Sequence, residues 1–211
     1  MVKRSVRIYI EGGSTGRTAD QDFRRGWKKF LMELHEFARR HGFDTLEVVR
    51  GKGRQNTFER FKNHRREYPD DLCVLLVDSE IEVPEGQGPW DTVCRRDGDQ
   101  WVKPDWATEQ HIYLMVQFVE AWILTDQDAL KRYFGEGFNS KFLPTTNLNG
   151  RSKDDINKAL ERATERSRKG SYRHGQAHEV MEYVRSEKVK TLPDGRRLFE
   201  ELPALIEQNG T

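Results

Sequence analysis

The sequence predicts an α/β fold in which a mainly parallel, doubly wound sheet is flanked by helices. Three short apolar runs, at residues 5–10, 43–50 and 72–77, have the length and composition of strands. The segments between them carry apolar residues at helical spacing, and we expect helices over about 20–42 and 57–68. The alternating order of strands and helices favours parallel strands joined by helical crossovers.

The segment from residue 81 to 105 is predicted to be a long loop, because it is rich in proline and glycine. Tryptophans in or beside it, Trp90, Trp101 and Trp106, indicate that it packs against another part of the protein. A structural flap over the edge of the sheet is the preferred interpretation. Stacking of the tryptophans on nucleic-acid bases is the alternative.

The rest of the chain predicts one further strand and then mostly helix. The strand is expected over 112–117 and a helix over about 118–133. The tail is predicted to be helical in pieces, over about 153–168 with Ser152 as its N-cap, 176–186 and 196–202. We therefore expect an α/β core over residues 1–139 and a helical C-terminal part over 140–211, packed on the same domain.

Composition limits the class of protein. The 211 residues carry 34% charged side chains and a formal net charge of +1, so bulk charge does not indicate a nucleic-acid-binding protein. No apolar run approaches the roughly 20 residues that a membrane span needs, and the N-terminal residues lack the pattern of a signal peptide. Two cysteines, Cys73 in an apolar run and Cys94, do not make a disulfide framework. We expect a cytoplasmic protein with no membrane contact.

Acidic residues follow the predicted strands. Glu11 closes the first apolar run, Asp78 and Glu80 follow the third, and Glu120 follows the apolar stretch 112–119. In open α/β sheets the ligand site lies outside the carboxyl ends of the strands, so these carboxylates can converge. Crowded carboxylates repel one another, which favours a bound cation or raised pKa values. The ions that suit such oxygen ligands are Mg²⁺ and Mn²⁺, whereas a turn with surface acids is the alternative for residues 78–80.

A glycine-rich turn and several basic residues are candidate phosphate contacts. The turn at 11–16, Glu-Gly-Gly-Ser-Thr-Gly, matches neither GxxxxGK[ST] nor GxGxxG. Its glycines Gly12 and Gly13 allow a tight backbone turn that can admit a phosphate or water. Basic stretches indicate either contacts to a phosphodiester or ordinary solvated helix faces. The basic candidates are Lys52, Arg54, Lys169 and Arg173.

This set of motifs resembles the Toprim domain, which is shared by topoisomerases, primases and the OLD-type nucleases of phage-defence systems. That domain has a glutamate and a glycine-rich turn after its first strand and an Asp-x-Asp/Glu motif on a later strand. The stretch 111–126, HIYLMVQFVEAWILTD, is similar to the Met-Val-Gln…Glu-Ala-Trp signature of a Toprim-like family of unknown function, the DUF4276 family. The tail, with Tyr-Arg-His-Gly at 172–175 and Arg-Arg-Leu-Phe at 196–199, is also similar to that family. The resemblance covers nearly the whole chain and implies a Toprim/Rossmann-like fold.

The resemblance implies roles for the acidic residues. Glu11 matches the glutamate that is proposed as a metal ligand or general acid/base. Asp78 and Glu80 match the Asp-x-Asp pair, with glutamate in place of the second aspartate. Glu120 matches the glutamate of the Glu-Ala-Trp stretch and is expected to be a further ligand of the same Mg²⁺ or Mn²⁺ site.

The resemblance also implies a downstream basic residue, because OLD-type nucleases use a lysine to offset charge in the transition state. We expect it near position 174, where this chain has His174, with Lys169 and Arg173 as close substitutes. His174 and His178 lie one helical turn apart and could bind a transition metal. A phosphate contact, an acid/base role or a plain surface role for these histidines is preferred.

Two functions follow as hypotheses. The first is a Mg²⁺- or Mn²⁺-dependent phosphodiesterase, a nuclease acting on DNA or RNA in a phage-defence system. The alternative is a non-catalytic or conditionally active subunit that is regulated by a separately encoded ABC- or SMC-like ATPase, since the chain has no Walker motif. The tryptophan-bearing loop is the expected docking surface, and either function is compatible with an oligomer. A topoisomerase or primase role is disfavoured, because the chain is too short for the additional modules.

Overall fold

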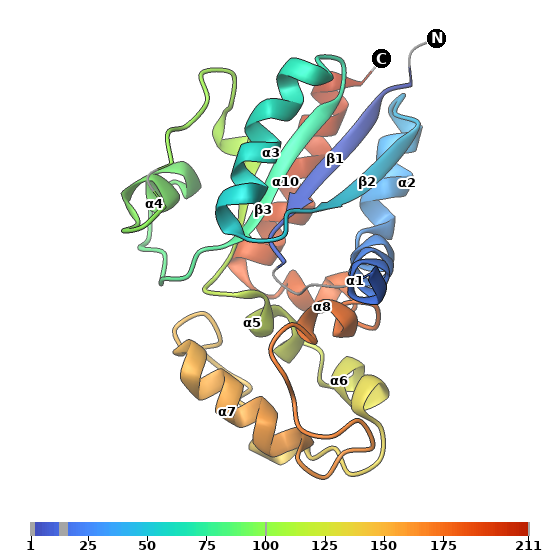
Figure 1. Cartoon of the computed structure of the whole chain (residues 1–211), viewed down its shortest axis with the longest axis vertical. Coiled ribbons are helices and arrows are strands. Elements are labelled where there is room, and N and C mark those ends of the chain that lie inside the picture. The colour runs from blue at the N-terminus through green and yellow to red at the C-terminus, as the bar shows by residue number, and fades with distance from the viewer. Residues whose placement is uncertain (1–2, 13–16, 100, 211) are drawn as a thin grey trace.

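The computed structural model describes residues 3–12, 17–99 and 101–210 and contains one sheet in those ranges (Figure 1). The four strands are all parallel, in the order β2-β1-β3-β4, which confirms the predicted parallel sheet. The strands are β1 (Ser5–Ile10), β2 (Thr45–Arg50), β3 (Leu72–Asp78) and β4 (Ile112–Met115). The fold is therefore α/β and Rossmann-like, with a helical C-terminal part, as expected.

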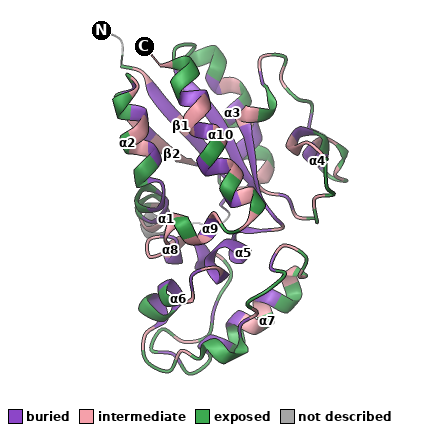
Figure 2. Cartoon of the chain, turned by 180° about the vertical axis from the view of Figure 1, so that it is seen from behind, coloured by how far each residue is buried: buried purple, intermediate pink, exposed green. Residues whose placement is uncertain are grey.

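Helices cover both faces of the sheet (Figures 1 and 2). α3 (Arg54–Glu67) and α4 (Pro89–Arg95) pack on one face. α1 (Arg17–Phe30), α2 (Met32–Arg40) and α10 (Pro193–Asn209) pack on the other. Successive side chains of a strand point to opposite faces, so the central strand β3 contributes to two apolar cores. This double coverage explains why the strands read as continuous apolar runs.

The chain beyond β4 forms short helices below the carboxyl end of the sheet and then returns along it (Figure 1). Two 3-10 turns, at Glu109–His111 and Ser140–Phe142, flank this region. α10 runs back along the sheet and contacts α2 and β4. The proposed division of the chain at residue 139 remains a prediction. The short helices are α5 (Val119–Leu124), α6 (Gln127–Phe134), α7 (Lys153–Thr164), α8 (Ala177–Val180) and α9 (Ser186–Val189).

The helix after β2 begins one turn earlier than predicted, and this shift matters for the site. α3 starts at Arg54 rather than at Thr57, after Gly53 with a φ of 105°. The Thr57 hydroxyl donates to the Gly53 carbonyl at 2.6 Å from inside the first turn, so Thr57 is not the N-cap. The earlier start brings Arg54 to the carboxyl edge of the sheet.

Other expected helices are divided or have different bounds. The helix expected over 118–133 is two helices, because Asp126 caps α6 through the Ala129 amide (3.3 Å) and also binds Arg185 (2.7 Å). The helix expected over 20–42 is likewise α1 and α2. In the tail, Ser152 caps α7 as predicted, with its hydroxyl accepting from the Asp155 amide. The segment 176–186 contains only α8 and the start of α9, and α10 is longer than expected.

The segment over residues 81–105 is a packed flap and contains α4, which was not predicted. Trp90 and Trp101 are 2% and 3% exposed, and Trp101 stacks on Phe58 of α3 with 4.4 Å between ring centroids. Trp106 packs against Phe61. The structural interpretation of this segment is therefore confirmed. Trp90 and Trp101 are too buried to stack on bases or to form an exposed docking surface.

Two further expectations concern the membrane and the thiols. Within the described ranges, no helix has both the length and the apolar character needed to cross a membrane.

Cys73 and Cys94 are free, and burial raises the pKa of the Cys73 thiol to about 12. The expected reduced core cysteine is confirmed.

Candidate functional site

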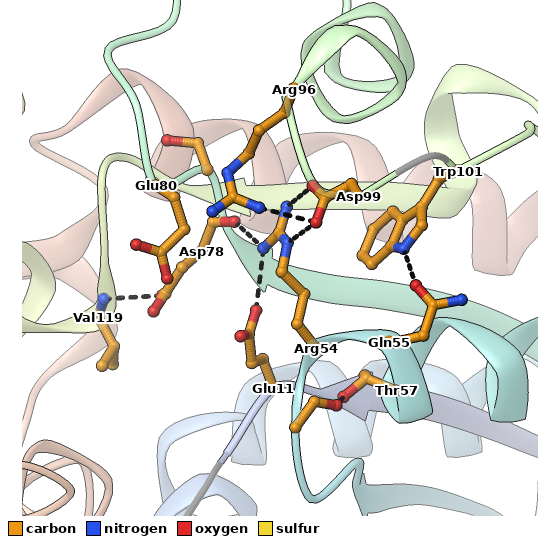
Figure 3. Close-up of polar contacts among 12 residues, drawn as sticks. Glu11, Arg54, Gln55, Thr57, Asp78, Glu80, Arg96, Asp99, Trp101 and Val119 are labelled. Atoms are coloured by element: carbon orange, nitrogen blue, oxygen red, sulfur yellow. Dashed lines mark hydrogen bonds and ion pairs between the residues drawn. The ribbon is translucent and has the colours of Figure 1, made fainter.

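The four acidic residues singled out from the sequence come together at the carboxyl edge of the sheet. Glu11 follows β1, Asp78 ends β3, Glu80 lies two residues later, and Glu120 lies in the first turn of α5. Figure 3 shows the first three in one region of the site, beside Arg54. Burial raises the pKa of Asp78 well above its ordinary value, and the charges of Glu11, Glu120 and Glu80 raise it further. The four carboxylates therefore form one electrostatic cluster.

Backbone hydrogen bonds between the ends of two strands hold the cluster in place. The Ser79 amide donates to the Met115 carbonyl at 3.0 Å, and the Glu80 amide donates to the Gln117 carbonyl at 2.8 Å. Asp78 Oδ1 accepts from the Val119 amide at 2.9 Å, at the start of α5. Glu80 has a φ of 60°, an uncommon conformation for a residue with a side chain. The turn after β3 is thus tied to the segment that carries Glu120.

Lys153, which the sequence analysis did not identify as a site residue, completes the cluster. Its Nζ lies 3.3 and 3.4 Å from the two Glu80 carboxylate oxygens. Burial lowers the pKa of Lys153, but Glu80, Asp78 and Glu120 together raise it above its ordinary value. A lysine in the first turn of a helix is opposed by the helix dipole. That unfavourable position, directly after the predicted cap Ser152, is the signal in the sequence that could have identified it.

Arg54 is in the site, but its guanidinium is fully engaged. It donates to Asp99 through two bonds of 2.7 and 2.8 Å, to Glu11 Oε2 at 3.0 Å and to the Asp78 carbonyl at 2.5 Å (Figure 3). Asp99 belongs to the flap and also accepts from Arg96 at 2.7 Å. Arg54 therefore links the flap to Glu11, and a phosphate contact from Arg54 would need these bonds to change.

Glu120 is the most buried of the four acids, with 2% exposure. Its Oε1 accepts from the Tyr172 hydroxyl at 2.7 Å. Burial raises the pKa of Tyr172 well above its ordinary value, and the charge of Glu120 raises it further. His174 lies at the rim, with its Nδ1 3.8 Å from Glu120 Oε1 and its side chain 78% exposed. Tyr172 and His174 of the tail thus reach the cluster, and the expected role of a basic residue near position 174 stays a prediction.

The basic residues proposed as phosphate contacts lie in three different settings. Lys169 and Arg173 line one cavity of about 490 Å³ together with His174, beside Glu120. Lys52 is exposed in the turn before α3. Arg54 is engaged as described above. The structure thus brings only Lys169, Arg173 and His174 around a shared cavity.

The glycines of the predicted phosphate turn are only partly described. A Cβ at Gly12 would lie 2.5 Å from a ring carbon of Phe23, so close packing accounts for this glycine. Gly13 lies outside the described residues.

His178 and His174 have different surroundings. His178 is half-buried, and its Nδ1 accepts from the Trp27 indole at 3.1 Å, whereas His174 is largely exposed. Burial lowers the pKa of His178 to about 3, and the charge of Arg50 acts in the same direction. The Trp27 indole thus occupies one ring nitrogen of His178, and the His174–His178 transition-metal interpretation stays a prediction.

The carboxylates fit a hard divalent cation by chemistry but are not gathered around one point as ligands. In the described part of the chain, no three His, Cys, Asp or Glu side chains are placed to hold a metal ion together. Glu11 and Glu80 face Arg54 and Lys153 instead. Burial is the main cause of the raised pKa of Asp78, and the charges of Glu11, Glu120 and Glu80 add to it, so a cation bound beside Asp78 would favour the ionised form. Glu11 and Glu80 would have to exchange their basic partners for the ion.

Comparison with known families supports the resemblance seen in the sequence. The model of one family, described as a domain of unknown function (DUF4276), matches residues 10–190. Comparisons with curated proteins and with solved structures found no match. The matched range runs from the last residue of β1 to just past the end of α9 and includes all four acidic residues of the cluster. The chain therefore belongs to the DUF4276 family.

Proposed function

We propose that the chain is a Mg²⁺- or Mn²⁺-dependent phosphodiesterase, a nuclease that cleaves DNA or RNA in a phage-defence system. The observation that carries the proposal is the cluster of Glu11, Asp78, Glu80 and Glu120 with Lys153 at the carboxyl edge of a parallel sheet. Acidic clusters with an adjacent basic group suit phosphoryl chemistry. The resemblance to the Toprim domain and to OLD-type nucleases supports the same reaction class.

The acidic residues would hold the ion, and Lys153 would act on the phosphate. Asp78 is the central ligand, because Val119 fixes one of its oxygens and the other three acids surround it. When bound, the ion supplies positive charge that polarises the phosphodiester. The Lys153 ammonium, released from Glu80, would stabilise the charge that develops on the phosphate.

The cavity beside Glu120 offers a path for the phosphate backbone. Lys169 and Arg173 line it, and His174 joins it to the carboxylates. Contacts of this kind position a nucleic acid without reading its sequence. Binding through these residues should weaken with added salt, because phosphate contacts release counterions.

Cleavage by the purified chain tests the proposal. Plasmid DNA, single-stranded DNA and RNA are incubated with the protein in Mg²⁺ and in Mn²⁺, and the products are resolved on gels. We expect cleavage that requires the metal and is abolished in Asp78→Ala. Glu85→Ala, which removes an exposed acid from the flap, is the matched control and should cleave normally. Absence of cleavage on every substrate, or equal cleavage by Asp78→Ala, would contradict the proposal.

A further inference from the structure

We propose that a cavity beside the edge strand β4 binds a nucleobase, and so selects the nucleotide next to the scissile bond. The inference rests on the proposed function. The cavity has a volume of about 350 Å³, which lies at the small end of the range for ligand sites. The flap, the end of β4, the loop before α7 and the start of α10 form its walls. It is separate from the carboxylate cluster but adjoins it.

Most of the cavity surface is apolar, and one polar atom of a lining residue is unsatisfied. Val83, Leu114, Val116 and Pro193 supply flat aliphatic surface suited to the face of a planar ring. Asn149 also lines the cavity, and its Oδ1 is a buried acceptor with no hydrogen-bond donor among the described residues. A buried acceptor left unpaired is costly. The oxygen has almost no exposed surface in the unliganded cavity, so a ligand N–H would remove the cost after a small movement of the Asn149 side chain or its cover.

The orientation of the Asn149 amide is fixed by its neighbour. Its Nδ2 donates to Asp194 Oδ1 at 2.8 Å, so the oxygen must face the other way. Asp194 is held in turn by the Val116 amide (3.0 Å) and the Trp122 indole (2.5 Å). This hydrogen-bond network therefore fixes the position of Asn149 Oδ1 before any ligand binds. Ring N–H and exocyclic amino groups are the donors that nucleobases offer.

The charges in the cavity favour a neutral base over a phosphate. The one lining cation among the described residues, Arg197, is already used: it donates to the Ile112 and Glu109 carbonyls and pairs with Glu201 at 2.9 Å. Glu82 adds a carboxylate to the lining. An anionic group would meet this acid without an uncommitted basic partner, whereas a neutral ring with N–H donors suits both the acid and Asn149.

Short segments connect the cavity to the carboxylate cluster. Glu82 and Val83 follow Glu80 closely on the flap, and Asn149 precedes Lys153 on the loop into α7. Gln117 links the two segments, because its side-chain amide donates to the Asn149 carbonyl at 3.0 Å and its own carbonyl accepts from the Glu80 amide at 2.8 Å. A nucleotide with its base in the cavity would thus have its phosphate on the side of Lys153 and the carboxylates.

Ligand-observed NMR on the full chain, without metal, tests base binding. The probes are the four nucleoside monophosphates AMP, GMP, CMP and UMP, the corresponding nucleosides, and ribose 5-phosphate. We expect at least one monophosphate and its nucleoside to bind, and ribose 5-phosphate to bind more weakly by about tenfold or more, equivalent to about 1.4 kcal/mol. Equal binding of ribose 5-phosphate, or no binding of any nucleoside, would overturn the inference. Because the assay needs no cleavage, its result is independent of whether the chain is a nuclease.

A cavity-filling variant locates the binding. Val83→Phe adds a ring to the lining from the flap, away from the Asn149–Asp194 network, and should weaken base binding at least about tenfold. Val102→Phe, at a 78% exposed position of the same flap, is the matched control and should bind as wild type. Thermal melts establish that both variants fold. If both variants bind alike, the base does not occupy this cavity.

Cleavage of homopolymeric oligonucleotides tests whether the cavity binds a base of the substrate strand or only a free nucleotide. If the cavity reads the strand, wild type should cleave the homopolymer of the bound base fastest, and Val83→Phe should lose that preference while still cleaving. Equal rates on all homopolymers, with mononucleotide binding intact, would overturn the role in substrate selection.

Discussion

Asp71 and Asp78 stand at the two ends of β3, and their surroundings are opposite. Asp71, before the strand, accepts from the Ser5 amide at 2.8 Å and from Arg7 Nε at 2.9 Å, and His64 Nε2 lies 3.4 Å away. Asp78, at the end of the strand, accepts from one backbone amide and is surrounded by other acids. One carboxylate is matched by donors, and the other is crowded by charges of its own sign.

This difference indicates which end of the sheet is built for stability and which for function. A buried charge with several donors is compensated, whereas a carboxylate among carboxylates costs free energy of folding. Such a cost is expected where charge is arranged to receive a ligand. Two further uncommon features, the positive φ of Glu80 and the unpaired Asn149 oxygen, lie at the Asp78 end, whereas the Asp71 end has the unpaired His64 Nε2. The amino end acts as a scaffold for the carboxyl end.

The largest expected effect is on catalysis at the Asp78 end. Lys153→Met removes the ammonium that faces Glu80, and we expect kcat for cleavage to fall by about 10²–10³, the usual effect of losing a group that stabilises transition-state charge. KM should change much less, because the loss falls on the transition state. Steady-state kinetics on an oligonucleotide measure both.

A second lysine of the same helix is the control for that prediction. Lys158 lies on α7, pairs with Asp154 and is largely exposed. Lys158→Met should leave kcat within about twofold, because exposed pairs contribute little. Equal losses in the two variants would show that α7 needs positive charge in general and that Lys153 has no specific role.

The parallel sheet could be predicted from the sequence, and so could the edge of the sheet where the acidic residues lie. Strand ends are marked by local apolar runs, and parallel strands bring their carboxyl ends to one edge, so Glu11, Asp78 and Glu80 could be placed together without a structure. The basic partners of these acids could not be predicted from the sequence. Lys153 and Arg54 reach the cluster through a loop and through a shifted helix start, which depend on tertiary packing.

Two local features of the chain differ from their prediction. The flap was read as a loop because Pro and Gly outweigh the short helical pattern of α4. The division of helices at Asp126 depends on its distant partner Arg185. The partner ATPase, the oligomeric state and the identity of the nucleic acid stay predictions.

The next effect is a loss of stability at the Asp71 end. Asp71→Ala leaves the Ser5 amide and Arg7 without their acceptor, and we expect about 3 kcal/mol of destabilisation, typical of breaking a buried charge pair. Urea unfolding measures it. Glu47→Gln removes the more exposed partner of the same arginine and should cost less than about 1 kcal/mol. Similar losses in both variants would refute the distinction between a buried, multiply bonded acid and an exposed one.

A smaller effect of opposite sign is expected at the Asp78 end. Asp78→Asn removes one of the mutually repelling charges but keeps an oxygen for the Val119 amide, so the metal-free protein should gain roughly 1 kcal/mol, or about 2–4 °C in Tm. Mn²⁺ should raise the Tm of wild type by mass action and raise that of the variant much less. A variant that melts lower without metal and keeps the full Mn²⁺ shift would show that Asp78 is a structural turn residue.

The smallest effect is in the pH dependence of stability, and its sign follows from the raised pKa of Asp78. The folded state holds this proton more tightly than the unfolded state, so Asp78 costs stability as pH rises from about 4, its unfolded pKa, to its raised folded pKa. Asn does not titrate. The gain of Asp78→Asn over wild type in metal-free buffer should therefore grow with pH in that window, with a slope of at most about 1.4 kcal/mol per pH unit for a single carboxyl, and then become constant. Histidines with lowered pKa values, such as His178, act oppositely, with stability lost as pH falls, but they are common to both proteins and cancel in the difference. Urea unfolding at several pH values gives the two curves. A difference that is flat across the window would mean that Asp78 ionises as freely in the folded protein as in the unfolded chain, and the contrast with Asp71 would then lie in hydrogen bonding alone.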